Sequence, residues 1–261
     1  MKIASWNVNS VKVRLPHLLD YLKSAQPDVL CLQEIKCPAE DFPQLEVQAL
    51  GYRVEAIGQR AYNGVALISK EPARDIVCGL PEPGDDDQAR YIEASFTGAA
   101  GGEVRVASIY LPNGNPIDTD KFTYKLAWMD RLLGHAQALL RRELPFVLAG
   151  DYNICPTDED VYDPVAFRDD ALCQRESRAR FRALLYLGLT DSYRAFHREP
   201  HRYTFWDYQA GRWNRDEGLR IDHLLLSPHA ADRVTACEID KSPRGKDRAS
   251  DHTPIWCELA V

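Results

Sequence analysis

One stretch of the chain, residues 145–153, constrains the fold more than any other. It reads Pro-Phe-Val-Leu-Ala-Gly-Asp-Tyr-Asn, and its run of apolar residues is typical of a fully buried strand. Gly150 ends the run, and Asp151 and Asn153 follow on the same side of an extended chain. Because a carboxylate at the end of a buried strand is costly unless it is paired or used, the stretch predicts a strand that delivers an acid and an amide to one edge of a sheet.

The same order of elements is expected in both halves of the chain. Residues 2–8 and 29–32 have the composition of strands, and the leucines between 15 and 25 have helical spacing. Residues 104–111 and the opening stretch predict two more strands, and apolar residues from 122 to 140 predict a long amphipathic helix between them. The chain is therefore expected to be an α/β protein whose two halves each contain a strand, a helix and a strand.

Shorter elements complete the expected pattern. Further strands are predicted over residues 52–57, 64–69, 90–96, 221–226, 234–239 and 254–259, and a helix from 181 ends at Gly188. Residues 79–88, with Pro81, Pro83 and three successive aspartates, predict a surface loop, and 197–218 a long loop with arginines and aromatic residues. No segment has the composition of a linker, so residues 1–261 are expected to form one domain.

Composition limits the class of protein. With 45% hydrophobic and 27% charged residues, the chain has the make-up of a soluble globular protein. No apolar run is long enough for a transmembrane helix, and the first residues lack the pattern of a signal peptide. The net charge of −7 argues against a passive nucleic-acid coat protein, but it allows an enzyme with an acidic metal site.

The cysteines indicate a reducing environment. There are seven, an odd number, and none forms a C-x-x-C pair. Neither a disulfide framework nor a zinc cluster is expected. The cytoplasm is the expected location.

Polar side chains gather where the predicted strands end. They are Asn7, Asn9, Glu34, Tyr110, Asp151, Asn153, Asp222, Asp251 and His252. In open α/β proteins, ligands bind at the carboxyl ends of strands. Acids without a cluster of cysteine or histidine suit Mg²⁺ or Mn²⁺ rather than zinc. Glu34 and Asp251 are the candidate metal ligands, with Asn9 near them, and Asn7, Asn153 and Tyr110 are candidate donors to phosphate oxygens.

His252 needs an acid other than its neighbour. Adjacent side chains of an extended chain point apart, so Asp251 cannot orient the ring. Asp222 is the best remaining candidate. A histidine held by a carboxylate is favoured as an imidazolium, which can donate to a phosphate oxygen.

Seven segments together resemble the exonuclease III family of abasic-site (AP) endonucleases, within the endonuclease/exonuclease/phosphatase superfamily. In chain order they are Trp6-Asn7-Val8-Asn9, Leu32-Gln33-Glu34-Ile35-Lys36, Gly64-Val65-Ala66-Leu67, Tyr110-Leu111-Pro112-Asn113-Gly114, Gly150-Asp151-Tyr152-Asn153-Ile154-Cys155-Pro156-Thr157, Gly218-Leu219-Arg220-Ile221-Asp222 and Ser250-Asp251-His252-Thr253-Pro254. The Asp-His ending alone points only to the superfamily. The resemblance is narrowed to the abasic-site nucleases by the segments over residues 32–36, 110–114 and 218–222.

The resemblance implies a DNase I-like, four-layer α/β sandwich of two packed mixed sheets with helices outside. It also implies a monomeric, Mg²⁺-dependent DNA repair nuclease that acts on duplex DNA with abasic sites or blocked 3′ ends. Such an enzyme cuts 5′ to abasic sites, acts as a 3′–5′ exonuclease and cleans 3′ ends. The rivals are a small-molecule phosphoesterase on the same fold and a non-catalytic DNA-binding protein.

The resemblance also implies roles for individual residues. Glu34 binds the metal, with Asp251 supporting it and Asn9 nearby, and Asp151 activates the attacking water, which Asn153 orients. Asn7, Tyr110 and His252 hold the scissile phosphate, and Asp222 orients His252. His252 remains the alternative general base, since an aspartate needs its pKa raised to serve at neutral pH.

Substrate contacts are expected mainly from the loop over residues 202–220. Phe205, Trp206 and Leu219 are the candidate walls of a pocket for a flipped-out abasic sugar. The other candidate DNA contacts are Lys36, Asn113, Arg212, Arg215 and Lys246. One departure from the family pattern is Arg248-Ala249 before the Ser-Asp-His motif, where relatives usually have Lys-Pro.

Overall fold

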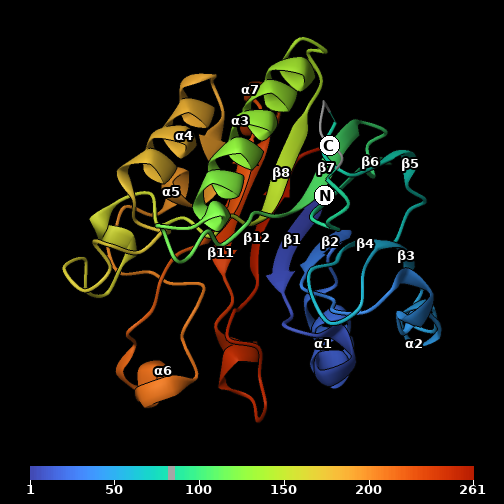
Figure 1. The fold of residues 1–261 in the computed structure, drawn as a ribbon. Coiled ribbons are helices and arrows are strands. Elements are labelled where there is room, and N and C mark those ends of the chain that lie inside the picture. Colours follow the sequence, from blue (N-terminus) through green and yellow to red (C-terminus); the bar gives the residue numbers. More distant parts are fainter. Residues whose placement is uncertain (82–85) are drawn as a thin grey trace.

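Two six-stranded sheets pack face to face, with helices on their outer faces (Figure 1). This arrangement comes from a computed structural model that describes residues 1–81 and 86–261. It confirms the expected four-layer α/β sandwich. The surface loop expected over 79–88 lies in part outside the described residues.

Both sheets are mixed. The first has the order β11 (Val234–Ile239), β12 (Ile255–Leu259), β1 (Lys2–Asn7), β2 (Val29–Gln33), β4 (Val65–Ser69), β3 (Arg53–Ile57). The second has the order β5 (Arg74–Cys78), β6 (Tyr91–Thr97), β7 (Glu103–Tyr110), β8 (Phe146–Asp151), β10 (Asp222–Leu226), β9 (Thr190–Asp191). In each sheet the central pair, β1 with β2 or β7 with β8, is parallel, and the pairs on either side are antiparallel.

The two halves of the chain repeat one unit. Helix α1 (Val11–Ala25) connects β1 to β2, and helix α3 (Asp120–Leu140) connects β7 to β8. A parallel pair needs such a crossover. The relation between the halves that the order of elements predicted is therefore confirmed in the topology.

Three apolar layers hold the four structural layers together. Alternate strand residues such as Ile3 and Cys31 face the other sheet and form the central core. Their neighbours Ala4 and Leu30 face outward, beneath α1 and α2 (Gln44–Gln48). The outer face of the second sheet is covered by α3 and α4 (Arg175–Tyr186). Because both faces of each sheet are buried, the strands read as apolar runs rather than as alternating patterns.

The differences from the expected elements lie at the periphery. Strand β5 was not predicted, because it is an exposed edge strand with few apolar residues. Helix α4 begins at Arg175 rather than near Phe181, since its first turns are polar. Three helices of four or five residues were also not predicted: α5 (Ser192–Phe196), α6 (Arg212–Arg215) and α7 (Pro228–Ala231).

Two compositional expectations can be compared with the structure. All seven cysteines are free thiols. In the part of the chain that the structure describes, no helix is both long and apolar enough to cross a membrane.

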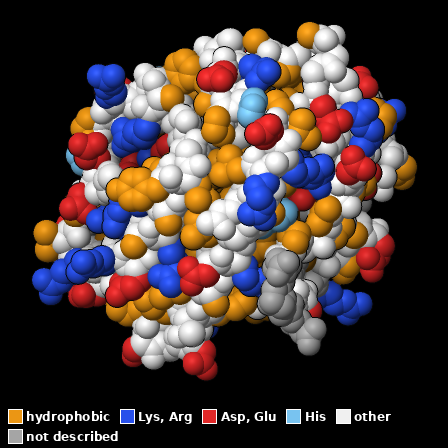
Figure 2. Space-filling view, turned by 90° about the horizontal axis from the view of Figure 1, so that it is seen from above, with side chains coloured by type: hydrophobic (Ala, Val, Ile, Leu, Met, Phe, Trp, Pro, Cys, Tyr) orange, Lys and Arg blue, Asp and Glu red, His pale blue; other side chains and the backbone are white. Residues whose placement is uncertain are grey.

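The topology brings several strand ends to one edge of the sandwich. β1 and β8 end there, at Asn7 and Asp151, and β10 begins there, at Asp222. This edge lies at the bottom of Figure 1, below the arrowhead of β1. Figure 2 looks onto the opposite end, where acidic and basic side chains are interspersed.

Candidate active site

Asn7 connects two carboxylates that come from different sheets. Its Nδ2 atom donates to Oε1 of Glu34 at 2.8 Å and to Oδ2 of Asp151 at 2.9 Å. Asn7 ends β1 in the first sheet, and Asp151 ends β8 in the second. One buried amide therefore fixes the separation of the two acids at the edge of the sandwich.

Four residues of the site have left-handed backbone conformations. The φ values are 43° at Asn9, 50° at Glu34, 54° at Lys36 and 48° at Asn153. Such conformations are unfavourable for residues other than glycine, and they persist where surrounding contacts hold them. Here the backbone N–H of Asn9 donates to Oδ1 of Asn7, and that of Asn153 donates to Oδ1 of Asp151. These turns direct the polar side chains toward one another.

Asp151 has the ionisation behaviour of a group poised near neutral pH. The residue is 1% exposed, and burial raises its pKa to about 7, with the nearby Asp222 carboxylate adding to the increase. The positive charge of His252 and the hydrogen bonds from Asn7 and Asn153 oppose this shift. The group can therefore exchange a proton at physiological pH.

His252 lies between two aspartates. Its Nδ1 atom is 2.8 Å from Oδ2 of Asp222, and its Nε2 atom is 3.7 Å from Oδ2 of Asp151. Burial by itself lowers the pKa of the ring, but the carboxylates of Asp222 and Asp151 outweigh it and raise the pKa to about 10. His252 is therefore an imidazolium at neutral pH, paired with Asp222 as the sequence predicted.

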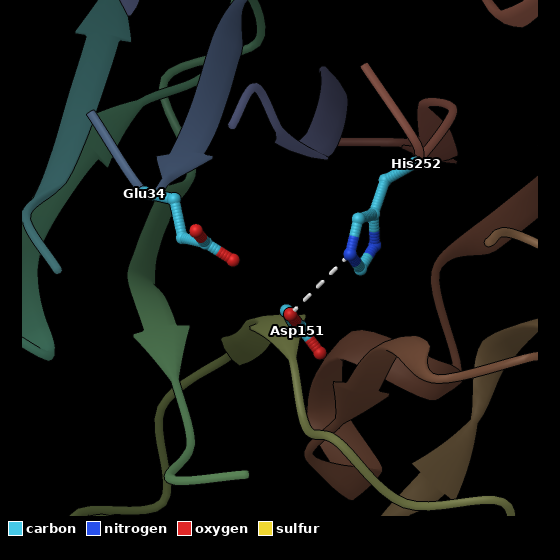
Figure 3. Close-up of side chains that lie close together, drawn as sticks. All are labelled: Glu34, Asp151 and His252. Atoms are coloured by element: carbon cyan, nitrogen blue, oxygen red, sulfur yellow. Dashed lines mark ion pairs between the residues drawn. The ribbon is translucent and has the colours of Figure 1, made fainter. Parts of the chain in front are cut away.

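The site offers oxygen ligands for a cation. Glu34, Asp151 and His252 form a group whose potential ligand atoms lie within 4.8 Å of one another, and Figure 3 shows the three side chains pointing into one space. The protonated ring of His252 does not suit a metal. The two carboxylates suit a hard divalent ion, which takes one or two carboxylates together with water and phosphate oxygens. The residues therefore fit Mg²⁺ or Mn²⁺.

Asp251 and Asn9, the other candidate metal residues, lie beside this group rather than in it. Nδ2 of Asn9 donates to Oδ1 of Asp251 at 3.1 Å, and Oδ1 of Asn9 accepts from Nζ of Lys36 at 2.5 Å. The same Nζ atom is 2.8 Å from Oε2 of Glu34. Asp251 is thus linked to Glu34 through Asn9 and Lys36 rather than facing it directly.

Tyr110 and Asn153 are the other candidate donors to phosphate oxygens. Burial, together with the carboxylates of Glu34 and Asp151, raises the pKa of Tyr110 well above its ordinary value, so its hydroxyl remains a donor. Asn153 donates through Nδ2 to the carbonyl of Leu111 at 2.9 Å and accepts at Oδ1 from Asn113 at 3.0 Å. Asn113, expected to contact substrate, therefore also fixes the Asn153 amide.

One residue of this region was not predicted. Lys125 on α3 is fully buried, and its Nζ atom donates to the backbone carbonyls of Asn113 at 2.9 Å and Asn153 at 2.6 Å. Burial lowers its pKa to about 7, although Asp151 and Asp170 oppose the shift. The only sequence signal was a lysine among the apolar positions of the helix. Lysine is so often exposed that the signal carries little weight.

Phe205 and Leu219 line one cavity of the structure, but Trp206 does not. Phe205 packs edge to face on His252, with ring centroids 4.9 Å apart. Phe205 and Leu219 line a cavity of about 250 Å³ that also includes Asn113, Leu172 and others. Trp206 is fully buried, since its indole packs on Trp213 and donates to Asp216. It is therefore not a wall of the pocket, and the expectation for this residue is corrected.

The candidate phosphate-binding cations are paired with acids. Glu217 accepts from Nη1 of Arg212 at 2.6 Å and from Nη2 of Arg215 at 2.7 Å, and Lys246 is 3.0 Å from Asp20. Pairs of this kind near the surface contribute little to stability, and an arginine paired with one carboxylate keeps further N–H donors for a phosphate.

Ala249, the departure from the family pattern, is buried. Its carbonyl accepts from the hydroxyl of Tyr208 at 2.9 Å and from Arg14 at 3.2 Å. These two bonds hold the loop before Asp251 in place without the proline.

Known proteins share this architecture. The family model described as "Endonuclease/Exonuclease/phosphatase family" matches residues 4–252. The chain is 34% identical to exodeoxyribonuclease III of Haemophilus influenzae, over 99% of this chain and all of that protein. A 3′ phosphatase from Neisseria bound to a product DNA hairpin superposes with a TM-score of 0.94 at 40% identity, and an AP endonuclease from Archaeoglobus fulgidus with 0.93 at 35%; both alignments cover 100% of each chain.

These similarities extend over nearly the whole chain, and they agree with the resemblance of the seven segments. The chain belongs to the Endonuclease/Exonuclease/phosphatase family and, within it, to the exodeoxyribonuclease III group of phosphodiester-hydrolysing nucleases.

Proposed function

We propose that this enzyme is a Mg²⁺-dependent DNA repair nuclease that hydrolyses the phosphodiester 5′ to an abasic site and also removes nucleotides and blocking groups from 3′ ends of duplex DNA. The observation that carries the proposal is the buried row Asp222–His252–Asp151, with Glu34 joined to it through Asn7. A non-catalytic DNA-binding protein has no need of such a costly arrangement.

The protonation states support Asp151 as the general base. A pKa of about 7 leaves much of Asp151 ionised at neutral pH, whereas a pKa of about 10 leaves His252 without a free lone pair. Asp151 takes the proton of the attacking water as its oxygen bonds to phosphorus, and the bond to the leaving 3′ oxygen breaks. Asn153, whose turn is hydrogen-bonded to Asp151, positions the base.

Donors around the phosphate stabilise the charge that develops on its oxygens. His252 supplies an imidazolium N–H, and Tyr110 and Asn7 supply neutral donors. Asp222 keeps the ring of His252 charged and oriented.

Glu34 is the principal metal-binding residue of the proposal, with Asp251 and Asn9 placed behind Lys36. When bound there, Mg²⁺ supplies positive charge next to the phosphate, and Mn²⁺ is the expected substitute.

The cavity lined by Phe205 and Leu219 fits the sugar of an abasic residue that has left the helix. Arg212, Arg215, Lys246 and Lys36 are the proposed contacts to DNA phosphates. We also propose that residues 1–261 act as one domain and as a monomer, and that the enzyme works in the cytoplasm, where seven free thiols stay reduced.

One assay tests the proposal directly. Duplex DNA with a single abasic-site analogue is incubated with the enzyme in Mg²⁺ and in EDTA, and a duplex ending in a 3′ phosphate is treated in parallel. We expect incision on the 5′ side of the analogue only with Mg²⁺, and a loss of incision in Asp151→Asn. Absence of incision at every enzyme concentration would refute the proposed function.

A further inference from the structure

Two cavities lie on either side of one wall in the loop over residues 202–220. The pocket next to His252, of about 250 Å³, is lined by Leu219 and by Phe205, whose ring packs on His252. An open groove of about 680 Å³ contains His201 and Tyr203. Tyr162, Arg212 and Glu217 line both cavities, so these three side chains separate them.

The wall is held by one carboxylate. Oε2 of Glu217 accepts from Nη1 of Arg212 at 2.6 Å and from Nη2 of Arg215 at 2.7 Å, and Oε1 accepts from Nε of Arg215 at 2.8 Å. Held in this way, the guanidinium of Arg212 lies over the ring of Tyr162, 4.6 Å from its centroid. Hydrogen bonds from Arg215 and Arg212 lower the pKa of Glu217 to about 2, so the carboxylate is ionised throughout the working range of the enzyme.

The ion pair between Arg212 and Glu217 lies near the protein surface. The side chains of Arg212 and Glu217 are 30% and 28% exposed, and surface ion pairs of this kind add little to folding stability. The short helix α6, which carries Arg212 and Arg215, is flanked by residues in the left-handed region. Their φ values are 54° at Ala210, 61° at Gly211 and 53° at Asp216. Removal of the carboxylate would therefore free Arg212 without disturbing the core.

The reactions proposed for this enzyme differ in what lies on the 3′ side of the phosphorus that is attacked. In abasic-site incision it is a sugar without a base. In exonuclease action it is a complete terminal nucleoside, and in removal of a 3′ phosphate there is no residue. A pocket that receives this residue therefore discriminates by its size between the first two reactions but not the third.

We propose that Glu217 sets the substrate preference of the enzyme, because it holds Arg212 over Tyr162 and so closes the pocket to a residue that carries a base. With the wall open, the pocket joins the groove and a 3′-terminal nucleoside can enter. This inference rests on the function proposed above and adds a specificity-determining residue to it.

The test compares three rates in wild type, Glu217→Gln and Glu217→Ala. They are incision at an abasic-site analogue, release of an ordinary 3′-terminal nucleotide, and removal of a 3′ phosphate, all from the same duplex. The matched control is Glu103→Gln, since Glu103 also pairs with an arginine, Arg74, at 2.9 Å, but lies at the start of β7, at the far end of the sandwich. Thermal melting of each variant verifies folding.

We expect the ratio of nucleotide release to abasic incision to rise several-fold in both Glu217 variants, while the ratio of 3′-phosphate removal to abasic incision stays unchanged. Both ratios should stay unchanged in Glu103→Gln. An unchanged ratio in folded Glu217 variants would overturn the inference while leaving the proposed function intact. A wild-type enzyme inactive on all three substrates would instead refute the proposed function, and the inference with it.

Discussion

Nδ1 of His252 lies 2.8 Å from Oδ2 of Asp222 inside the protein, and this contact decides the charge of the ring. Both side chains are almost completely buried. Burial alone would make the imidazole neutral, yet its pKa is raised to about 10 because carboxylates face it. The positive charge at the site therefore depends on Asp222, a residue that lies behind the ring.

Replacement of Asp222 by asparagine should make His252 neutral at physiological pH. Without that carboxylate, burial is less opposed and the pKa of the ring falls toward or below its ordinary value of about 6.5. We expect kcat to fall roughly 10²- to 10³-fold, since a charged donor to the phosphate is lost. The alkaline limb of the pH–rate profile should move down from near pH 10. NMR titration of the His252 ring measures the change directly, and a ring pKa unchanged from wild type would contradict this account.

The acid limb of the same profile should report Asp151. A general base must be ionised, so activity should fall as the pH drops through about 7. Asp151→Asn should lose this limb together with nearly all activity, whereas Asp41→Asn, at a half-exposed carboxylate paired with Lys12, should change neither. If Asp151→Asn kept its full rate, His252 would have to be reconsidered as the base.

Stability should depend on Asp151 in the opposite sense to activity. Because its pKa is raised on folding, the native state binds a proton that the unfolded chain has released between roughly pH 4 and pH 7. The free energy of unfolding therefore decreases as the pH rises through this window. In Asp151→Asn that decrease should be smaller, as measured by urea unfolding at pH 5 and pH 8. An equal decrease in both proteins would show that Asp151 is not the group that titrates.

The sequence predicted the strands well where apolar runs were continuous, whereas the sandwich itself was implied by the family resemblance. β2 and β8 are buried on both faces, so each appears in the sequence as a continuous apolar run that predicts a strand. Edge strand β5 was missed because an exposed strand has little apolar signal. The sequence also predicted the polar groups at the strand ends, because an acid directly after a buried strand is energetically costly unless it is paired or used.

Other parts of the site depend on packing that a sequence does not record. Trp206 and Phe205 are adjacent aromatic residues, but only Phe205 faces the cavity, because Trp213 and Asp216 hold the indole of Trp206 in the interior. The wall formed by Arg212 and Glu217 likewise depends on side-chain contacts across a loop. Spacing along the chain carries no information on such contacts.

Replacement of the buried Lys125 by methionine should impair catalysis more than folding. The change leaves the carbonyls of Asn113 and Asn153 without their donor, and small displacements of a catalytic turn can cost about 10²-fold in rate. Removal of a buried cation offsets part of the lost hydrogen bonding. We expect kcat to fall at least tenfold, KM to change little, and the free energy of unfolding to change by no more than about 2 kcal/mol.

Lys121→Met is the matched control, because Lys121 lies one turn earlier on α3 and is exposed. Kinetics on an abasic-site duplex give kcat and KM, and urea unfolding gives the free energy of unfolding. A Lys125→Met variant that unfolds readily but turns over normally while folded would show that the lysine has only a structural role.

Lys36 should weaken the binding of a divalent cation at Glu34. Its Nζ atom lies 2.8 Å from Oε2 of Glu34 and 2.5 Å from Oδ1 of Asn9, so ammonium and metal ion compete for the same oxygens. Burial favours the neutral acid, but Lys36 and Asn7 outweigh it and lower the pKa of Glu34. Lys36→Met removes a like charge, and we expect the Kd for Mn²⁺ to fall roughly tenfold on Coulombic grounds.

Calorimetric titration with Mn²⁺ measures this affinity independently of turnover. Lys70→Met is the appropriate control, since Lys70 pairs with Asp28 at 2.9 Å at the other end of β2 and should leave the Kd unchanged. Glu34→Ala should abolish binding in the same experiment. If Lys36→Met bound Mn²⁺ no more tightly than wild type, the ammonium would not be a competitor for the metal, and its contacts to Glu34 and Asn9 would serve only to hold their turns.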